Sequence, residues 1–391
     1  IPDPGLFSSG HLAFSTKLSM FILVPMILTS TLWLARLSRR TMLECVDRAA
    51  RAMELADRRQ ELLVEAKQDL EHALRAGSGK SGRYTNQNAG SYQLGPLVSQ
   101  GAIGEIYRAR HRRDAKPAAV KVLQAATLHR NNAVMRFMRE GQIATSLNCE
   151  YIVKTHEVGQ LSDELPYMAM EWLDGEDLAS RLRRDTTLPV VIACELVDHI
   201  GQGLACAHDS NIVHRDLKPS NIFWARSSAN TPTSWKILDF GVSKLLHADQ
   251  TLTEDGLIGT PGYMAPEQAR GQDADARSDI FSFGAVVYRA LTGRPPFAAP
   301  NLPQTLYRLA YINPPCPMTA GHPMSKDVAR VLAIALAKAP KDRFQSATAF
   351  TDAFAAAANT RLSETYRQHA DALLAQYPWG ADTSGRQSST I

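Results

Sequence analysis

The residues best suited to chemistry form the run His214-Arg215-Asp216-Leu217-Lys218-Pro219-Ser220-Asn221, followed by Asp239-Phe240-Gly241. Moving the terminal phosphoryl group of ATP to a hydroxyl needs a carboxylate that accepts the hydroxyl proton and oxygen ligands that hold magnesium on the phosphates. Asp216 suits the first task, and Asn221 and Asp239 suit the second. In an extended loop Lys218 points to the same side as Asp216 and can neutralise charge on the transferred group, which suits a Ser or Thr acceptor.

These motifs resemble those of the eukaryotic-like (Hanks-type) Ser/Thr protein kinases of bacteria, and the resemblance runs from near Tyr92 to near Phe354. It implies an α+β fold of two lobes, a small β-rich N-terminal lobe and a larger helical C-terminal lobe. ATP and Mg2+ are then expected to bind between the lobes. We therefore expect a protein kinase domain at residues 92–354.

The resemblance includes a hairpin that would bind the ATP phosphates. The family has G-x-G-x-x-G-x-V where this chain has Ser99-Gln100-Gly101-Ala102-Ile103-Gly104-Glu105-Ile106. By the resemblance Ser99, Gly101, Gly104 and Ile106 line the ATP site. Because Ser99 replaces the first Gly, we expect a stiffer loop or a higher Michaelis constant for ATP without loss of the fold. A plain β-turn is the alternative for this segment taken alone.

A lysine interrupts the short apolar strand 118–122. The resemblance implies that Lys121 contacts the α- and β-phosphates and forms an ion pair with a Glu on the next helix. Glu140 lies on a segment whose apolar residues recur at helical spacing, so we expect it to be that Glu. Taken alone, Lys121 would be a solvent-facing strand residue and Glu140 an exposed helix residue.

The strand that ends at Glu171 looks like the hinge between the lobes. Met170 then holds the gatekeeper position, and the backbone of Glu171 and Leu173 faces adenine. Core packing is an equally good account of Met170. Apolar periodicity predicts a buried helix over 190–208 that supports the catalytic loop. The Ser-, Asn- and Thr-rich stretch 223–235 suggests a surface insertion.

The segment from Asp239 to Glu267 resembles an activation loop that ends in A-P-E. Thr251 and Thr253 are the expected autophosphorylation sites, because Arg215 matches an Arg that commonly binds phosphothreonine in the family. An unmodified polar loop remains open for both. Thr260 matches the position that lines the acceptor site, so we assign it to substrate binding.

Three more residues match structural positions of the family. Asp279 matches an Asp that hydrogen-bonds the backbone of the catalytic loop. Glu267 and Arg343 match a buried ion pair that joins the A-P-E element to the lower lobe.

Residues 18–35 carry no charge and are rich in Leu, Ile, Met and Phe. A bilayer core of about 30 Å asks for roughly 20 residues, so we expect a transmembrane helix whose flanking cations snorkel outward. The arginines between 36 and 51 place its C-terminal side in the cytoplasm and residues 1–17 outside. A cleaved signal peptide and a buried core helix are the alternatives.

The span 36–76 is rich in helix-forming residues and is expected to be a juxtamembrane helix. An imperfect seven-residue apolar repeat favours a parallel coiled coil that would make a homodimer, although a solvated charged helix fits nearly as well. Residues 77–91 form the expected linker. Its Gly79-Lys80-Ser81 lacks the upstream Gly of a P-loop, so we reject nucleotide binding there.

The composition limits the partners. A net charge of +4 is too mild to imply nucleic acid, and the five cysteines show no C-x-x-C spacing that would suggest a zinc site. In the tail 355–391 a helix is expected near 362–376, before a Ser/Thr-rich end.

The sequence therefore predicts a Ser/Thr protein kinase of protein substrates, anchored in the inner membrane with its kinase domain in the cytoplasm. The alternative is a pseudokinase that serves as a scaffold or ligand-binding module. Its discriminating feature would be loss from the set Lys121, Glu140, Asp216, Asn221 and Asp239, and all five are present. A small-molecule kinase is disfavoured because residues 259–267 resemble a platform for protein substrates.

Overall fold

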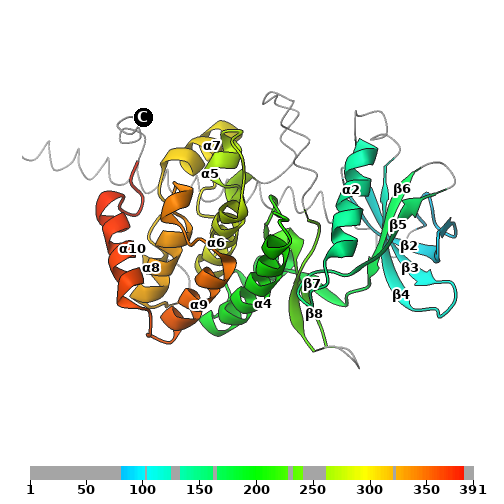
Figure 1. Ribbon diagram of the computed structural model, residues 1–391, viewed down its shortest axis with the longest axis horizontal. Coiled ribbons are helices and arrows are strands. Elements are labelled where there is room, and N and C mark those ends of the chain that lie inside the picture. The colour runs from blue at the N-terminus through cyan, green and yellow to red at the C-terminus, as the bar shows by residue number, and fades with distance from the viewer. Residues whose placement is uncertain are drawn as a thin grey trace, which may run out of the picture. The chain divides into compact units, whose positions relative to one another are not determined.

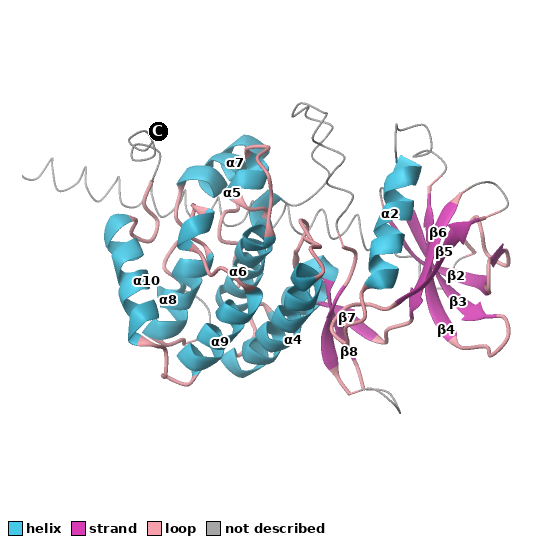
Figure 2. Ribbon diagram, viewed as in Figure 1, coloured by secondary structure: helices cyan, strands magenta, loops and turns pink. Residues whose placement is uncertain are grey.

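The computed structural model describes residues 81–101, 104–124, 133–161, 165–227, 232–240, 261–319 and 323–382 (Figure 1). The predicted segments 1–17, 18–35 and 36–76 lie outside these ranges, as do Thr251, Thr253 and Thr260. Within them, a strand-rich part comes first and a helical part follows (Figure 2). The predicted α+β fold of two lobes is confirmed.

The N-terminal lobe is a six-stranded antiparallel sheet in the order β1-β2-β3-β4-β6-β5. Its strands are β1 (Asn88–Ala89), β2 (Tyr92–Gln100), β3 (Gly104–His111), β4 (Pro117–Leu123), β5 (Thr155–Gln160) and β6 (Pro166–Glu171). On β4 the side chains of Ala118, Val120 and Val122 are buried, and Lys121 points to the opposite face because strand side chains alternate.

Helix α2 (Ala133–Ser146) packs on β5 and β6 (Figure 1). Phe137 of this helix joins a core with Met168 and Met170 of β6. A Cβ at Gly141 would lie 2.6 Å from a methyl carbon of Val158, so only glycine allows the helix this close to β5. Glu140, the residue before Gly141, is thereby held against the sheet.

The C-terminal lobe is mainly helical. Its helices are α3 (Leu178–Asp185), α4 (Val190–Asp209), α5 (Pro266–Ala269), α6 (Ala276–Thr292), α7 (Leu302–Tyr311), α8 (Lys326–Ala335), α9 (Ala347–Ala358) and α10 (Glu364–Gln376). Short 3-10 turns lie at η2 (Pro219–Asn221), η4 (Pro261–Tyr263), η5 (Pro317–Thr319) and η6 (Pro340–Asp342).

Helix α6 is the centre of this lobe, because every residue from Ser278 to Thr292 is buried. The Asp275 side chain caps its first turn by accepting from the Arg277 N–H, and Gly293 ends it with a φ of 76°. Helix α4, predicted from its periodicity, contacts α6, α9 and β9. By length and composition α4 is the one membrane-span candidate among the described residues, but its packing identifies it as a core helix.

A small sheet in the order β7-β8-β9 lies beside the catalytic loop, with strands β7 (Gly175–Asp177), β8 (Ile222–Ala225) and β9 (Ser234–Ile237). The prediction of a surface insertion over 223–235 is wrong at both ends, since these ends are paired strands. Trp235 is fully buried and its ring packs against Trp224 with centroids 4.6 Å apart. The error arose because polar residues cluster only in the middle of this stretch.

Helix α10 matches the helix expected near 362–376 and packs on α8. Arg367 of α10 and Arg330 of α8 both pair with Asp327, at 2.7 and 2.9 Å. The chain then returns toward α7, where Ile312 and Asp382 form an antiparallel bridge.

A buried ion pair joins α5 to the loop after η6. The guanidinium of Arg343 donates two hydrogen bonds of 2.7 Å to the two carboxylate oxygens of Glu267. Ser278 Oγ donates a third at 2.6 Å. Although burial by itself raises the pKa of Glu267, these donors hold it below its usual range.

Replacing Arg343 by Met should lower the free energy of unfolding by roughly 3–5 kcal/mol, because it leaves a charged carboxylate buried without its partner. Chemical denaturation of the full chain measures this. Arg184→Met is the control, since Arg184 pairs with Glu176 at the surface and its loss should change stability far less. Equal losses in the two variants would contradict the prediction.

Candidate functional site: the catalytic loop and the cleft between the lobes

The loop between α4 and β8 brings three of the predicted site residues together. Lys218 Nζ donates to Asp216 Oδ2 at 2.8 Å. The Asn221 amide nitrogen donates to the Asp216 carbonyl at 2.9 Å and lies 3.4 Å from Oδ2. Pro219 begins the 3-10 turn η2, which places Asn221 one turn after Lys218. The carboxylate of Asp216 is thus fixed by donors from its own loop.

Asp279, near the start of α6, anchors this loop from beneath. Its carboxylate is fully buried and accepts hydrogen bonds of 2.8 Å from the backbone N–H groups of His214 and Arg215. His208 Nε2, at the end of α4, lies 2.9 Å from Asp279 Oδ2. Arg215 adopts a φ of 64°, a costly conformation for a residue other than glycine, and these bonds help to hold it.

His214 links the catalytic loop to the segment before Asp239. Its Nδ1 accepts from the Asp216 N–H at 3.2 Å, and its Nε2 donates to the Leu238 carbonyl at 3.1 Å. Phe240 packs on the His214 ring with centroids 4.9 Å apart. Asp216 and Asp239 are therefore positioned by one shared ring.

The resemblance predicts an ion pair between Lys121 and Glu140, but Lys121 pairs with Asp239 instead. Its Nζ lies 2.9 Å from Asp239 Oδ1, and within the part of the chain that the structure describes no ion pair joins it to Glu140. Two carboxylates compete for one ammonium, and the loop after β9 brings Asp239 closer. Glu140 is still near enough for its charge to act on Lys121.

The three groups shift one another's pKa values. Burial raises the pKa of Glu140 to about 7, against the opposing charge of Lys121. The pKa of Lys121 lies above its ordinary value, because the nearby carboxylates outweigh the burial that would lower it. The pKa of Asp239 lies below its usual range, since Lys121 outweighs the effect of partial burial.

A small cavity lies behind Asp239 and next to the predicted gatekeeper. Its lining residues are Glu140, Ala144, Val153, Thr155, Met168, Met170, Asp239 and Phe240. Met170 is both part of the core with Phe137 and part of this wall, so the packing and the gatekeeper interpretations of Met170 describe the same position.

The hinge is held by an ion pair that sequence reasoning missed. Lys236 of β9 lies 2.7 Å from the Glu171 carboxylate, which also accepts from the Lys154 N–H at 2.9 Å. The Glu171 N–H donates to the Lys154 carbonyl at 2.9 Å, so this N–H is not available to a ligand. Leu173 is partly buried against the core that contains Met170. In the sequence, the only indication of this ion pair is that Lys236 stands between the apolar residues Trp235 and Ile237.

The Gly-rich hairpin connects β2 and β3. Ser99 pairs with Ile106 and Gln100 with Glu105, and the Gly101 N–H donates to the Gly104 carbonyl at 2.8 Å. A Cβ at Gly104 would lie 2.7 Å from the Val122 carbonyl, so glycine is required there. The positive-φ residues of the described chain do not include Ser99, which therefore occupies an ordinary strand position.

Side chains of the segment before A-P-E and of α6 pack beside Asp216 without leaving space for a water molecule. The residues gathered there are Arg215, Asp216, Leu217, Lys218, Tyr263, Met264 and Ser282. Gln268 of α5 joins this segment to the catalytic loop, because its Nε2 donates to the Arg215 carbonyl at 2.9 Å. Sequence reasoning missed Gln268 and His208, since neither stands in a motif that it used.

Comparisons with known proteins agree with this geometry. The family described as "Protein kinase domain" matches residues 92–355. Serine/threonine-protein kinase PknB of Mycobacterium leprae is 36% identical over 260 residues, which are 66% of this chain and 41% of that protein. Serine/threonine-protein kinase Pkn1 of Myxococcus xanthus is 36% identical over 277 residues, 70% of this chain and 39% of that protein. The chain thus spans less than half the length of these curated relatives.

A solved structure of a kinase domain has a similar fold. The PknI kinase domain of Mycobacterium tuberculosis has a TM-score of 0.56 and 26% identity, over 69% of this chain and 98% of that one. Since the family match also covers more than half of the sequence, this chain belongs to the protein kinase domain family.

Proposed function

We propose that this chain is an ATP-dependent kinase that phosphorylates Ser and Thr residues of protein substrates. The observation that carries the proposal is the catalytic loop, in which Asp216 lies beside Lys218 and Asn221. The two curated relatives are named as serine/threonine-protein kinases, which supports the same activity. The pseudokinase alternative has no comparable support, because every predicted catalytic position keeps its side chain.

In the proposed reaction the acceptor hydroxyl gives its proton to Asp216 while its oxygen attacks the terminal phosphorus of ATP. The bond from that phosphorus to the bridging oxygen breaks, and ADP leaves. Lys218 donates to oxygens of the transferred group and limits the negative charge that develops there. The Lys218 ammonium lies 2.8 Å from the Asp216 carboxylate, so the group that accepts the proton and the group that stabilises the charge are next to each other.

Asn221 and Asp239 fit a magnesium ion because both offer hard oxygen donors. The Asn221 amide nitrogen is bonded to Asp216, which leaves its carbonyl oxygen for a cation. Lys121 contacts one oxygen of Asp239, whose side chain is 39% exposed. Bound magnesium would neutralise charge on the ATP phosphates.

The residues beside Asp216 suit a protein acceptor. Tyr263 and Met264, from the segment before A-P-E, lie next to it. We assign Thr260, three residues before Tyr263 in the chain, to the same substrate-binding surface. A peptide hydroxyl that docks against this segment would lie near the Asp216 carboxylate and Lys218.

We also propose two levels of control. Autophosphorylation of Thr251 or Thr253 would give Arg215 a phosphate partner next to the catalytic residue. Binding of ATP with magnesium would release Lys121 from Asp239, and Lys121 would then pair with Glu140.

Residues 18–35 would anchor the chain in the inner membrane with the kinase domain on the cytoplasmic side, and residues 36–76 would bring two chains together.

Phosphate transfer by the purified full chain, with ATP and magnesium, tests the function. Mass spectrometry should find phosphate on Thr251 or Thr253, and the Asp239→Ala variant should carry none. Transfer to a generic protein acceptor should depend on the same residue. Nucleotide binding without transfer to any protein would favour the scaffold function instead.

Asp216→Asn should lower kcat by about 10²- to 10⁴-fold, because the hydroxyl loses its proton acceptor. The affinity for ATP should change little, since Asp216 faces the acceptor. Steady-state kinetics and a nucleotide titration measure the two quantities. Asp352→Asn, an exposed carboxylate on α9, is the matched control. An unchanged kcat in Asp216→Asn would refute the assigned base.

Glu140→Gln should remove a pH dependence of stability. The folded-state pKa of Glu140, about 7, lies above its ordinary value of 4.5, so the folded chain binds this proton more tightly. The resulting stability is complete below pH 4.5 and is lost as the pH rises through 7, by up to about 3 kcal/mol.

Denaturation between pH 5 and 8 compares the parent with Glu140→Gln. The parent should lose stability over this range, and the variant should be flatter by the amount given above. Glu150→Gln, at an exposed position, should follow the parent. Identical curves for parent and Glu140→Gln would show that Glu140 does not titrate in this range.

A further inference from the structure

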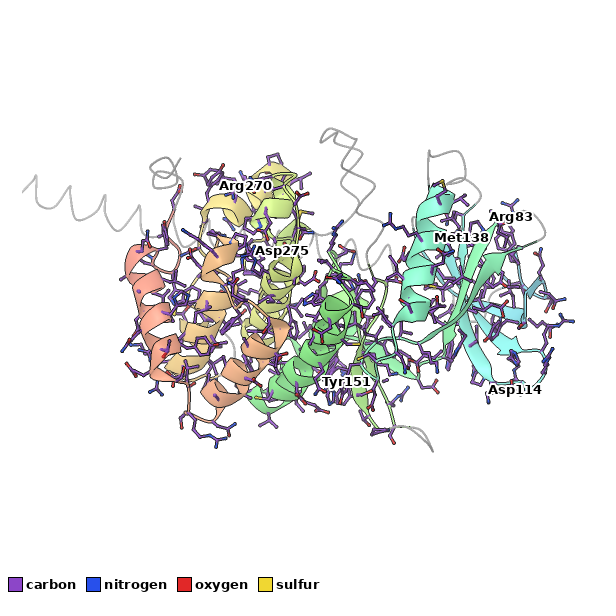
Figure 3. All side chains as sticks on the ribbon, viewed as in Figure 1. Arg83, Asp114, Met138, Tyr151, Arg270 and Asp275 are labelled. Carbon is purple, nitrogen blue, oxygen red and sulfur yellow. The ribbon has the colours of Figure 1, made fainter. Side chains whose placement is uncertain are left out.

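Residues 82–89, here called the strap, precede the matched kinase family residues and are ordered against the sheet. Arg83 of the strap, labelled in Figure 3, lies at the sheet end of the molecule. The Asn86 N–H donates to the Leu94 carbonyl at 2.8 Å, and the Leu94 N–H donates to the Gln87 carbonyl at 2.9 Å. The strap is therefore tied to β2 by its own backbone.

Tyr84 is the part of the strap that enters the core. It is only 3% exposed, and its ring meets the ring of Tyr107 edge to face with centroids 6.2 Å apart. The Tyr84 N–H donates to the Tyr107 hydroxyl at 3.2 Å. A Cβ at Gly82 would lie 2.5 Å from that same hydroxyl, so the strap closes tightly over it.

Tyr107 contacts both Tyr84 of the strap and Glu105 at the base of the Gly-rich hairpin. It is fully buried on β3, and its hydroxyl donates to Glu105 Oε2 at 2.5 Å. Burial and the neighbouring carboxylate raise the pKa of Tyr107, so the phenol keeps its proton and remains the donor. The other carboxylate oxygen, Glu105 Oε1, accepts from Gln100 Nε2 at 3.1 Å.

Gln100 and Glu105 flank the hairpin at its base. Gln100 directly precedes Gly101, Glu105 directly follows Gly104, and the two residues are paired across β2 and β3. Glu105 is 9% exposed, so each of its oxygens depends on the donor that it has. Losing the Tyr107 donor would leave a nearly buried oxygen unpaired and would loosen the base of the hairpin.

We propose that Tyr84 and Tyr107 are positioning residues for ATP, which act through Glu105 on the two ends of the phosphate-binding hairpin. This rests on the proposed function only in taking the hairpin as the site of the ATP phosphates. The strap lies before the matched domain. Residues that precede the strap in the chain are therefore joined directly to a segment that, by this proposal, affects the affinity for ATP.

Titration of the full chain with magnesium and a non-hydrolysable ATP analogue tests the proposal. Tyr107→Phe keeps the ring and removes the hydroxyl. It should weaken analogue binding about fivefold, the factor that corresponds to about 1 kcal/mol, and should leave kcat at saturating ATP within about twofold. Tyr84→Ala should weaken binding in the same direction. Amide exchange in the β2–β3 hairpin should quicken in both variants.

Tyr167→Phe is the matched control. Tyr167 is also buried in the sheet and its hydroxyl donates to a carboxylate, that of Glu157, at 2.5 Å, but among the described residues no hydrogen bond joins it to the hairpin. It should lower the melting temperature as Tyr107→Phe does and leave analogue affinity unchanged. Unchanged affinity in Tyr107→Phe, or an equal loss in Tyr167→Phe, would overturn the proposal.

The same titration separates this inference from the proposed function. A parent chain that binds the analogue but transfers no phosphate would refute the kinase activity. In that case, a fivefold loss in Tyr107→Phe would still support the positioning role, and no loss would still refute it.

Discussion

A fully buried carboxylate, that of Asp279, is the constraint on which the catalytic loop depends. A charge removed from water is strongly destabilising unless donors surround it, and here the donors are His208 and the backbone of His214 and Arg215. The helix α6 and the loop must therefore keep their relative positions. The same bonds hold Arg215 in its costly conformation, so Asp216, the next residue, is fixed by the folding of the whole lobe.

The charged side chains around Lys121 carry more negative than positive charge. Lys121 is the ammonium close to Asp239 and Glu140, and Asp216 adds a third carboxylate whose charge acts on both Lys121 and Glu140. Burial, and after it the charges of Asp239 and Asp216, raise the pKa of Glu140 against the opposing charge of Lys121. A magnesium ion brought with the phosphates would relieve this imbalance, and Lys121 is placed to exchange one carboxylate for another.

Two contacts outside the catalytic motifs bear on how the proposed kinase would be controlled. Gln268, directly after A-P-E, donates to the Arg215 carbonyl and so joins the end of that segment to the catalytic loop. At the other end of the molecule, Tyr84 and Tyr107 connect the strap to the hairpin. Both contacts join a segment outside the catalytic motifs to one of the motifs themselves.

From the sequence by itself, the resemblance of the motifs to a known family implied the two-lobed fold. The chemical class of the site followed from Asp216, Lys218 and Asn221, because these residues are close neighbours in the chain and their geometry is local. The α4 helix followed from its apolar periodicity, which is also a local pattern. Only the tertiary structure decided that Lys121 pairs with Asp239, that Lys236 holds Glu171, and that the ends of 223–235 are buried strands. These contacts join residues far apart in the chain, and which of several possible partners a charge takes depends on packing distances that no local pattern records.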